Sequence, residues 1–235
     1  MIPWLLDPPH FPPLSAAMRE PNGLLAAGGD LTPEWLIEAY RHGIFPWYNA
    51  GEPILWWSPD PRMVLYPAKV RISRSLRRRL RGNEYEVRCD SAFAEVVQAC
   101  AAPRRPGGGT WITEEMRLAY LAMHELGYAH SVECWQEGEL VGGLYGMAFG
   151  AAFFGESMFC RATDASKIAL AHLARHLDRK GFAVIDCQME TAHLASLGAE
   201  RIPRTDFVAM LNAIIPRGPA PGRWPHDAMA DIPWT

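Results

Sequence analysis

Residues 150–188 decide the fold, and they read GAAFFGESMFCRATDASKIALAHLARHLDRKGFAVIDCQ. Two apolar strand-like runs flank a helical pattern that Asp164 is placed to cap, which is typical of a β-α-β unit. Because side chains along a strand alternate between its two faces, Asp186 and Gln188 are predicted to share a face, with Cys187 on the other. The second strand is therefore expected to end by presenting a carboxylate and an amide together.

A second polar pair lies at the end of the preceding strand, where Glu156 and Ser157 follow an apolar run. If the two strands are neighbours, these side chains meet Asp186 at one end of the sheet. Open α/β sheets bind their ligands at such ends, so the cluster predicts a functional site. The alternative is a structural ion pair between Glu156 and either Lys167 or Arg161.

Composition bounds the size and the class of the protein. The chain has 235 residues, 49% of them hydrophobic, which is enough for one large domain or two unequal ones. Residues 1–62 are rich in Pro, Trp and Gly and predict a small N-terminal domain. From residue 63 to residue 235 the pattern is that of a hairpin-rich sheet followed by the β-α-β unit. The expected class is a mixed α/β (or α+β) protein with a small N-terminal domain and a larger second domain.

Membrane and secretory segments are not expected. Residues 140–155 carry no charge, but these 16 residues are short of the ~20 that span a bilayer and contain five Gly, so two buried strands around a turn explain them better. The N-terminus lacks a basic region and breaks on prolines, unlike a signal peptide. The five Cys form no C-x-x-C pair, which predicts reduced thiols in a cytoplasmic protein.

A basic run stands out although the net charge of the chain is -3. Residues 69–81 hold seven of the 23 basic residues and no acidic residue. The seven are Lys69, Arg71, Arg74, Arg77, Arg78, Arg79 and Arg81. Clusters of this kind bind phosphate backbones, since each neutralised phosphate releases counterions. The alternative is a solvated helix face.

Aromatic residues in turn-flanked segments offer a second nucleic-acid feature: Trp47, Trp56, Trp57, Trp111 and Phe153. The alternative is that they belong to the core. Trp47 and Trp111 lie beside loop residues, however, which suits a platform on which a base stacks.

Two further candidates are weaker. His172 and His176 are four residues apart on a predicted helix, but no third ligand accompanies them, so a surface pair is expected rather than a metal site. Cys187 has no evident base beside it and is expected to be a buried thiol rather than a nucleophile.

The longer motifs point to a family. They are EPNGLLAAGGDL, GIFPWY, ILWWSPDPR, TWIT, HELGYAHSVE, LVGGLYG, FFGESMF, ASKIAL and DCQ with HLASLGA. Together they resemble the leucyl/phenylalanyl-tRNA–protein transferase family, in order and over nearly the whole chain, from about Glu20 to Phe207.

The resemblance implies a larger domain with a GNAT-type acyltransferase fold. The implied reaction moves Leu, Phe or, less well, Met from aminoacyl-tRNA to the α-amine of a protein with N-terminal Arg or Lys. The product would enter the N-degron pathway of proteolysis. Neither a metal nor coenzyme A is implied, and a cytoplasmic monomer is expected.

The resemblance also implies roles for single residues. Asp186 and Gln188 match the family's catalytic pair. The residues that match the binding site for the aminoacyl end of the tRNA are Trp47 and Trp111 near the terminal adenosine, Phe153, Met158 and Ile185 lining the side-chain pocket, and Glu156 and Ser157 as polar members. Leu144 stands where Met or another apolar residue is expected in that pocket.

The expected chemistry depends mainly on positioning, because conversion of an ester to an amide is downhill. Holding both reactants in register is worth roughly 7–11 kcal/mol. Gln188 is expected to accept a hydrogen bond from the attacking amine and to orient it, because an amide is a poor base. Asp186 is expected to polarise Gln188 and to attract the cationic acceptor together with Glu156.

Two other functions remain open at this point. An acetyl-CoA-dependent N-acetyltransferase would share the fold, but the segment CRATDASKIAL lacks the glycines of a pyrophosphate loop. A non-catalytic RNA-binding module would use the basic run and the exposed Trp equally well, but it leaves the polar cluster unexplained.

Overall fold

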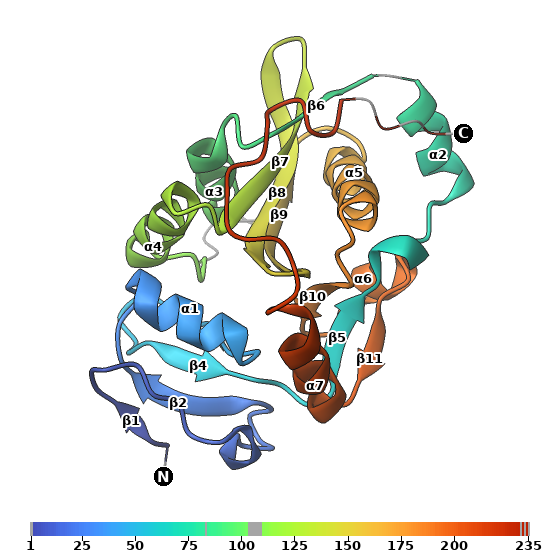
Figure 1. Ribbon diagram of the computed structural model, residues 1–235. Coiled ribbons are helices and arrows are strands. Elements are labelled where there is room, and N and C mark those ends of the chain that lie inside the picture. Colours follow the sequence, from blue (N-terminus) through green and yellow to red (C-terminus); the bar gives the residue numbers. More distant parts are fainter. Residues whose placement is uncertain (1, 83, 103–109, 231, 233, 235) are drawn as a thin grey trace.

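The computed structural model describes residues 2–82, 84–102, 110–230, 232 and 234. The N-terminal part forms a four-stranded sheet in the order β1-β2-β4-β3 (Figure 1). Its strands are β1 (Trp4–Leu5), β2 (Leu24–Gly28), β3 (Phe45–Pro46) and β4 (Leu55–Trp57), and the helix α1 (Pro33–Arg41) lies between β2 and β3 in the chain. Short 3-10 turns cover Leu14–Ala16 and Pro67–Lys69.

A seven-stranded sheet in the order β11-β5-β10-β9-β8-β7-β6 forms the larger part. Its strands are β5 (Arg62–Leu65), β6 (Glu86–Cys89), β7 (Ala129–Gln136), β8 (Glu139–Phe149), β9 (Ala152–Cys160), β10 (Val184–Gln188) and β11 (Glu200–Ile202). Among the paired strands of this sheet in the described ranges, only β9 and β10 run parallel. Helix α5 (Ala165–Arg179) connects these two strands, which confirms the β-α-β unit and makes them neighbours.

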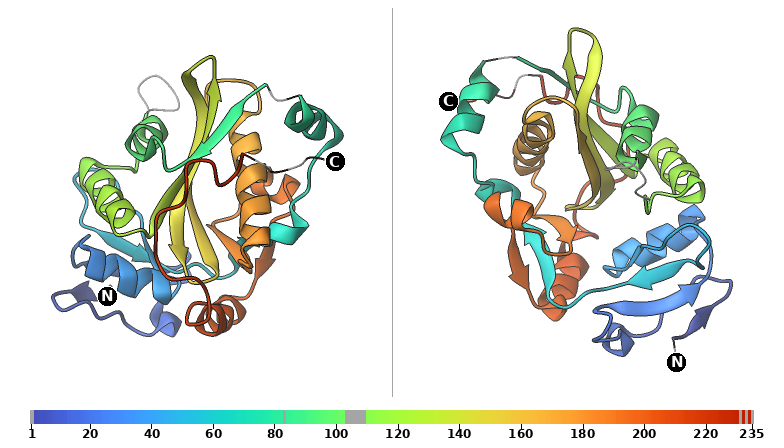
Figure 2. Two further views of the ribbon diagram at one scale, coloured as in Figure 1. Left: turned by 45° about the horizontal axis from the view of Figure 1, so that its top comes forward. Right: turned by 180° about the vertical axis from the view of Figure 1, so that it is seen from behind.

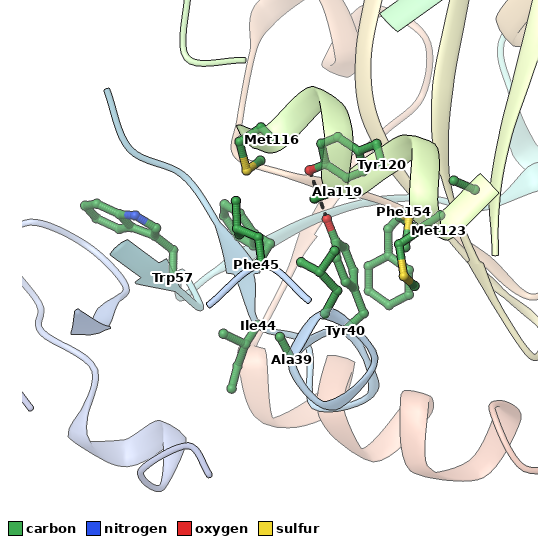
Figure 3. Packing of buried hydrophobic residues seen from close by; sticks show 14 of the residues in the cluster. Ala39, Tyr40, Ile44, Phe45, Trp57, Met116, Ala119, Tyr120, Met123 and Phe154 are labelled. Carbon is green, nitrogen blue, oxygen red and sulfur yellow. Dashed lines mark hydrogen bonds between the residues drawn. The ribbon is translucent and has the colours of Figure 1, made fainter. Parts of the chain in front are cut away.

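Helices cover both faces of the larger sheet (Figures 1 and 2). The remaining ones are α2 (Arg74–Arg81), α3 (Phe93–Ala101), α4 (Glu114–Glu125), α6 (Ala192–Ser196) and α7 (Arg204–Ile214). One buried cluster joins the four-stranded sheet to α1, α3, α4 and α7, and the other joins α5 to the opposite face of the seven-stranded sheet. The first cluster places α1 against α4 (Figure 3).

Local side chains cap some of the helix starts. Thr113 accepts the Met116 N–H at the start of α4, and Ser73 accepts the Leu76 N–H at the start of α2. Asp164 occupies the position before α5, but its carboxylate binds Lys167 instead of a backbone N–H. At α3 the backbone N–H of Ala92 is satisfied from another element, by the carboxylate of Glu133 on β7.

The uncharged segment 140–155 forms most of β8 and the beginning of β9, around the turn at Gly150 (φ +54°). This confirms the predicted pair of buried strands. In the part of the chain that the structure describes, no helix combines the length and the apolar character needed to cross a bilayer.

The segment after α7 crosses the sheet and reaches β6 (Figure 1). The Cys89 N–H donates to the His226 carbonyl at 3.1 Å, and Trp224 stacks on His130 at 4.0 Å. The indole of Trp234 donates to Nε2 of His172 at 3.0 Å. His172 and His176 are therefore buried, and the expectation of a surface pair was wrong because the segment after α7 covers their helix face.

Candidate active site

Asp186 lies in the middle of β10 and is completely buried. Its two carboxylate oxygens accept from Nε (2.8 Å) and Nη2 (2.6 Å) of Arg62, the first residue of β5. The third guanidinium nitrogen donates to the Gly43 carbonyl at 3.0 Å. Two parallel charge-assisted hydrogen bonds fix the carboxylate rigidly and compensate its charge.

This geometry corrects one expectation. Asp186 was expected to polarise the side chain of Gln188, but its Oδ1 accepts the backbone N–H of Gln188 at 2.9 Å. Because Arg62 already neutralises it, Asp186 also has little charge left to attract a cationic acceptor. Asp186 thus holds the main chain at Gln188.

Gln188 ends β10 in an unusual conformation, with φ of +54°. Asp186 pairs with Val64 and Gln188 with Met63, so one extra residue, Cys187, forms a bulge between them. The strict alternation assumed from the sequence therefore breaks here. A residue other than Gly is uncommon at positive φ. The hydrogen bond from the Gln188 backbone N–H to the Asp186 carboxylate stabilises this conformation.

Glu156 lies at a second bulge, in β9, where the pairing with β8 shifts between Tyr145 and Gly146. Its Oε1 accepts from the Tyr40 hydroxyl and its Oε2 from the Tyr120 hydroxyl, both at 2.7 Å. Nε2 of Gln188 donates to Oε1 at 3.4 Å. Glu156 and Gln188 thus converge as the sequence predicted, but Glu156 lies in the middle of β9, which continues to Cys160, and not at the end of the strand as expected.

The environment of Glu156 is unusual for a carboxylate. Burial raises the pKa of Glu156 to about 7, although the two tyrosine hydroxyls lower it. Burial also raises the pKa of Tyr40 and of Tyr120 well above the usual value, so both remain hydrogen-bond donors. Figure 3 shows these two rings approaching from α1 and α4, with their hydroxyls joined at 3.2 Å.

The alternative of a structural ion pair at Glu156 is wrong. Lys167 instead pairs with Asp164, at 2.8 Å. The guanidinium of Arg161 lies over the ring of Phe159, 5.3 Å from its centroid.

The apolar candidates gather on the opposite, α5-covered face of the sheet. Leu144, Phe153 and Ile185 are buried in the second cluster, and Met158 packs against it. Leu144 and Met158 are directly paired across β8 and β9, and so are Phe153 and Ile185 across β9 and β10. Ser157 is half-buried and pairs with Tyr145. One set of side chains that suits an apolar group therefore lies on the face of the sheet opposite to Tyr40 and Tyr120, the partners of Glu156.

The tryptophan candidates divide into two kinds. Trp56 and Trp57 are buried and belong to the first core cluster. Trp47 keeps 38% of its surface exposed and meets Trp57 edge-on at 5.5 Å. Trp111 is half-buried against the same cluster. Of these four tryptophans, Trp47 and Trp111 are the ones that keep surface that a base can contact.

The basic run forms α2 and the turn before it. Leu76 and Leu80 are buried, while Arg74, Arg77 and Arg78 on the same helix are exposed. The other four basic residues of the run make contacts or lie at its edge: Arg79 binds Glu84 and Asp164, Arg81 binds the Trp234 carbonyl, Lys69 lies over Tyr66, and Arg71 is exposed before the helix. Helix α2 lies across the molecule from the four-stranded sheet (Figure 2).

Sequence reasoning missed three residues of the site: Arg62, Tyr40 and Tyr120. Tyr40 and Tyr120 read as members of apolar helix stripes, and nothing local marks their hydroxyls. Arg62 had a usable signal, because an arginine at the start of a strand as apolar as Met63–Leu65 needs a buried partner. Cys187 is half-buried, and burial raises its thiol pKa, as expected for an unreactive thiol.

Comparisons with known sequences connect this geometry to a reaction. Residues 64–212 match the family described as leucyl/phenylalanyl-tRNA protein transferase, and residues 29–60 match its N-terminal domain. The leucyl/phenylalanyl-tRNA–protein transferase of Azoarcus sp. (strain BH72) is 66% identical over 235 residues, covering 100% of both chains. The chain belongs to the leucyl/phenylalanyl-tRNA protein transferase family. The protein of the same name from Aromatoleum aromaticum is 66% identical over 99% of this chain and 98% of its own.

Membership of the leucyl/phenylalanyl-tRNA protein transferase family confirms the predicted resemblance and makes the chain an aminoacyltransferase. The non-catalytic RNA-binding alternative is therefore wrong, and so is the acetyl-CoA alternative. The mixed α/β class, with an N-terminal domain and a main transferase domain, is confirmed as well.

Two solved structures resemble the chain distantly. A conserved protein of unknown function from Staphylococcus epidermidis has 10% identity and a TM-score of 0.42, over 77% of this chain and 68% of its own. A GCN5-related N-acetyltransferase-like protein from Streptococcus suis has 16% identity and a TM-score of 0.32, over 73% and 65%. The neighbours thus include the expected GNAT type, but at these scores they carry no argument about the site.

Proposed function

We propose that this enzyme transfers leucine or phenylalanine, and less well methionine, from aminoacyl-tRNA to the α-amine of proteins that begin with Arg or Lys. The modified protein then enters the N-degron pathway. The observation that carries the proposal is the contact between the Gln188 amide and the half-buried Glu156 carboxylate. It places a hydrogen-bond acceptor and an acidic group side by side, which is what a cationic amine acceptor needs.

The donor would be held by the exposed aromatic residues and the apolar cluster. Trp47 and Trp111 would stack on the terminal adenosine. The residues proposed to line the aminoacyl side-chain pocket are Leu144, Phe153, Met158 and Ile185, with Ser157 at its polar end. Their pairing on adjacent strands supports this assignment.

The acceptor amine would be oriented by Gln188. Since Nε2 of Gln188 donates to Glu156, its Oε1 is left to accept from the amine. The amine nitrogen then forms a bond to the ester carbon, the bond from that carbon to the ribose oxygen breaks, and the proton lost by the amine ends on that oxygen. The pKa of Glu156, about 7, lies close to that of an α-amine, about 7.7–8.0, so Glu156 is suited to accept that proton in passing.

Asp186 would act through the backbone. Its carboxylate fixes the left-handed conformation at Gln188, and this conformation aims the amide at Glu156. Asp186 is thus proposed as a positioning member of the catalytic pair rather than as a base.

The remaining assignments concern the tRNA body and the domains. The exposed arginines of α2 would contact its phosphates. A domain boundary close to residue 62 is supported by the sheets, since the four-stranded sheet ends at Trp57 and the seven-stranded sheet begins at Arg62, although a division between residues 62 and 63 would separate Arg62 from the rest of β5. The enzyme is proposed to work as a cytoplasmic monomer without a metal or coenzyme.

The direct test supplies labelled leucyl-tRNA and two acceptors that differ only in their first residue, Arg or Ala. Transfer to the Arg acceptor alone is expected. Equal transfer to both acceptors would refute the acceptor rule, and transfer to neither would refute the proposed reaction.

A further inference from the structure

Arg62 is a buried arginine whose three guanidinium nitrogens donate to two partners, the Asp186 carboxylate and the Gly43 carbonyl. It has no exposed side-chain surface, and its guanidinium lies over the rings of Phe45 (4.9 Å) and Phe207 (4.8 Å). We propose that Arg62 is a positioning residue that sets the two halves of the catalytic site in register. The inference rests on the proposed function, and it assigns to Arg62 a part in transfer beyond that of a structural ion pair.

The first half is reached through Asp186. Nε and Nη2 of Arg62 bind the two oxygens of this carboxylate, and Oδ1 accepts the Gln188 N–H. The backbone conformation at Gln188, with φ of +54°, is costly for a residue other than Gly and persists only when its surroundings enforce it. Arg62 therefore fixes the carboxylate that fixes the amide.

The second half is reached through the end of α1. Nη1 of Arg62 donates to the Gly43 carbonyl, and the Gly43 N–H in turn donates to the Tyr40 carbonyl at 3.1 Å. Tyr40 is the residue whose hydroxyl binds Glu156. One guanidinium thus links the strand that carries the amide to the helix that orients the carboxylate.

No other cation reproduces this geometry. The guanidinium is planar and offers five N–H donors in a fixed fork, and it stacks on aromatic rings. Lysine carries three donors on a single nitrogen and cannot reach a carboxylate in bidentate fashion and a carbonyl on the other side. Arg62→Lys is therefore expected to keep the charge but lose the register.

A purely structural ion pair is the competing explanation, and it predicts a different outcome. Removing one member of a buried pair leaves an uncompensated charge, but a lysine at position 62 keeps the charge that compensates Asp186. If Arg62 serves stability alone, Arg62→Lys should therefore keep both folding and transfer. If it positions the site, Arg62→Lys should keep folding and lose transfer.

The experiment measures single-turnover transfer from leucyl-tRNA to an acceptor that begins with Arg, together with melting temperature and leucyl-tRNA affinity. Arg62→Lys is expected to melt near the wild type and to bind leucyl-tRNA normally, but to transfer about 100-fold more slowly, as a displaced catalytic group does. A wild-type transfer rate in folded Arg62→Lys would overturn the proposal.

A second measurement holds even if Arg62→Lys fails to fold. Arg62→Ala is assayed with added methylguanidinium, which fits the space vacated by the side chain. Transfer is expected to recover with increasing methylguanidinium, while the matched control Arg201→Ala, an exposed arginine on β11, shows no response. Recovery of the melting temperature without recovery of transfer would contradict a positioning role. The wild-type rate, measured in parallel, tests the proposed reaction separately.

Discussion

At the scale of single residues, the site consists of two side chains held from behind. Glu156 is held by the hydroxyls of Tyr40 and Tyr120, and Gln188 is held through its backbone by Asp186. The residues proposed to contact the acceptor are thus held in place before it arrives. Catalysis by positioning requires this kind of preorganisation.

The raised pKa of Glu156 leads to a pH prediction. The carboxyl loses its proton as the pH rises through about 7, so the transfer rate should rise over that interval. Titration of the acceptor amine adds a second rise at about 7.7–8.0. Glu156→Gln should abolish the lower rise and keep the upper one. Single-turnover rates from pH 5.5 to 9 measure both, and an unchanged profile in Glu156→Gln would contradict the assignment.

The raised pKa of Glu156 also makes the free energy of unfolding depend on pH. The pKa of Glu156 in the folded state lies above the ordinary glutamate value of 4.5, so the unfolded chain loses this proton at a lower pH. Between pH 4.5 and about 7 the group therefore makes the free energy of unfolding fall as the pH rises. Glu156→Gln should reduce this slope in urea titrations.

At the scale of elements, sequence patterns predicted the strands around the site but not their bulges. Alternation and capping signals located β9, α5 and β10, because these signals are local. The bulge at Cys187 depends on the register with β5 and on Arg62, more than 120 residues earlier in the chain. The prediction that Asp186 and Gln188 share a face assumed strict alternation along β10, and the bulge breaks that alternation. Both residues nevertheless belong to the site.

The helix α2 carries a prediction of its own. Replacing the exposed Arg74, Arg77 and Arg78 together by Ala should weaken leucyl-tRNA binding and flatten its salt dependence by about 0.7–0.9 per lost phosphate contact. The rate of transfer from bound tRNA should stay unchanged, because α2 lies away from Glu156. Filter binding at several salt concentrations measures this, with the exposed Arg88→Ala on β6 as the control. Equal effects from the control would contradict a specific role for α2.

At the scale of the whole molecule, the site forms where the two sheets meet. Tyr40 comes from α1, Tyr120 from α4 and Glu156 from β9, and the hydroxyl of Tyr40 lies 116 residues from its partner in sequence. No local signal announces such contacts, which explains why the sequence predicted the carboxylate and missed the hydroxyls. The family resemblance predicted the fold because its motifs extend over both sheets.

The segment after α7 should stabilise the larger sheet from the α5 side. The Trp224 ring stacks on His130, which pairs with Asp90 at 2.8 Å. The backbone N–H of Trp224 donates to the same carboxylate at 3.2 Å. Trp224→Ala should lower the free energy of unfolding by about 2–4 kcal/mol, since it removes a large packed side chain. Urea denaturation measures this loss, and a change below about 0.5 kcal/mol would show that the segment is not part of the folded core.

The most direct test of the central claim is the single-turnover transfer rate of Gln188→Ala with saturating leucyl-tRNA and an acceptor that begins with Arg. Orientation of the amine by the amide predicts a rate about 100-fold below that of the wild type, with leucyl-tRNA affinity and melting temperature preserved. A wild-type rate in this variant would contradict the claim that Gln188 orients the attacking amine.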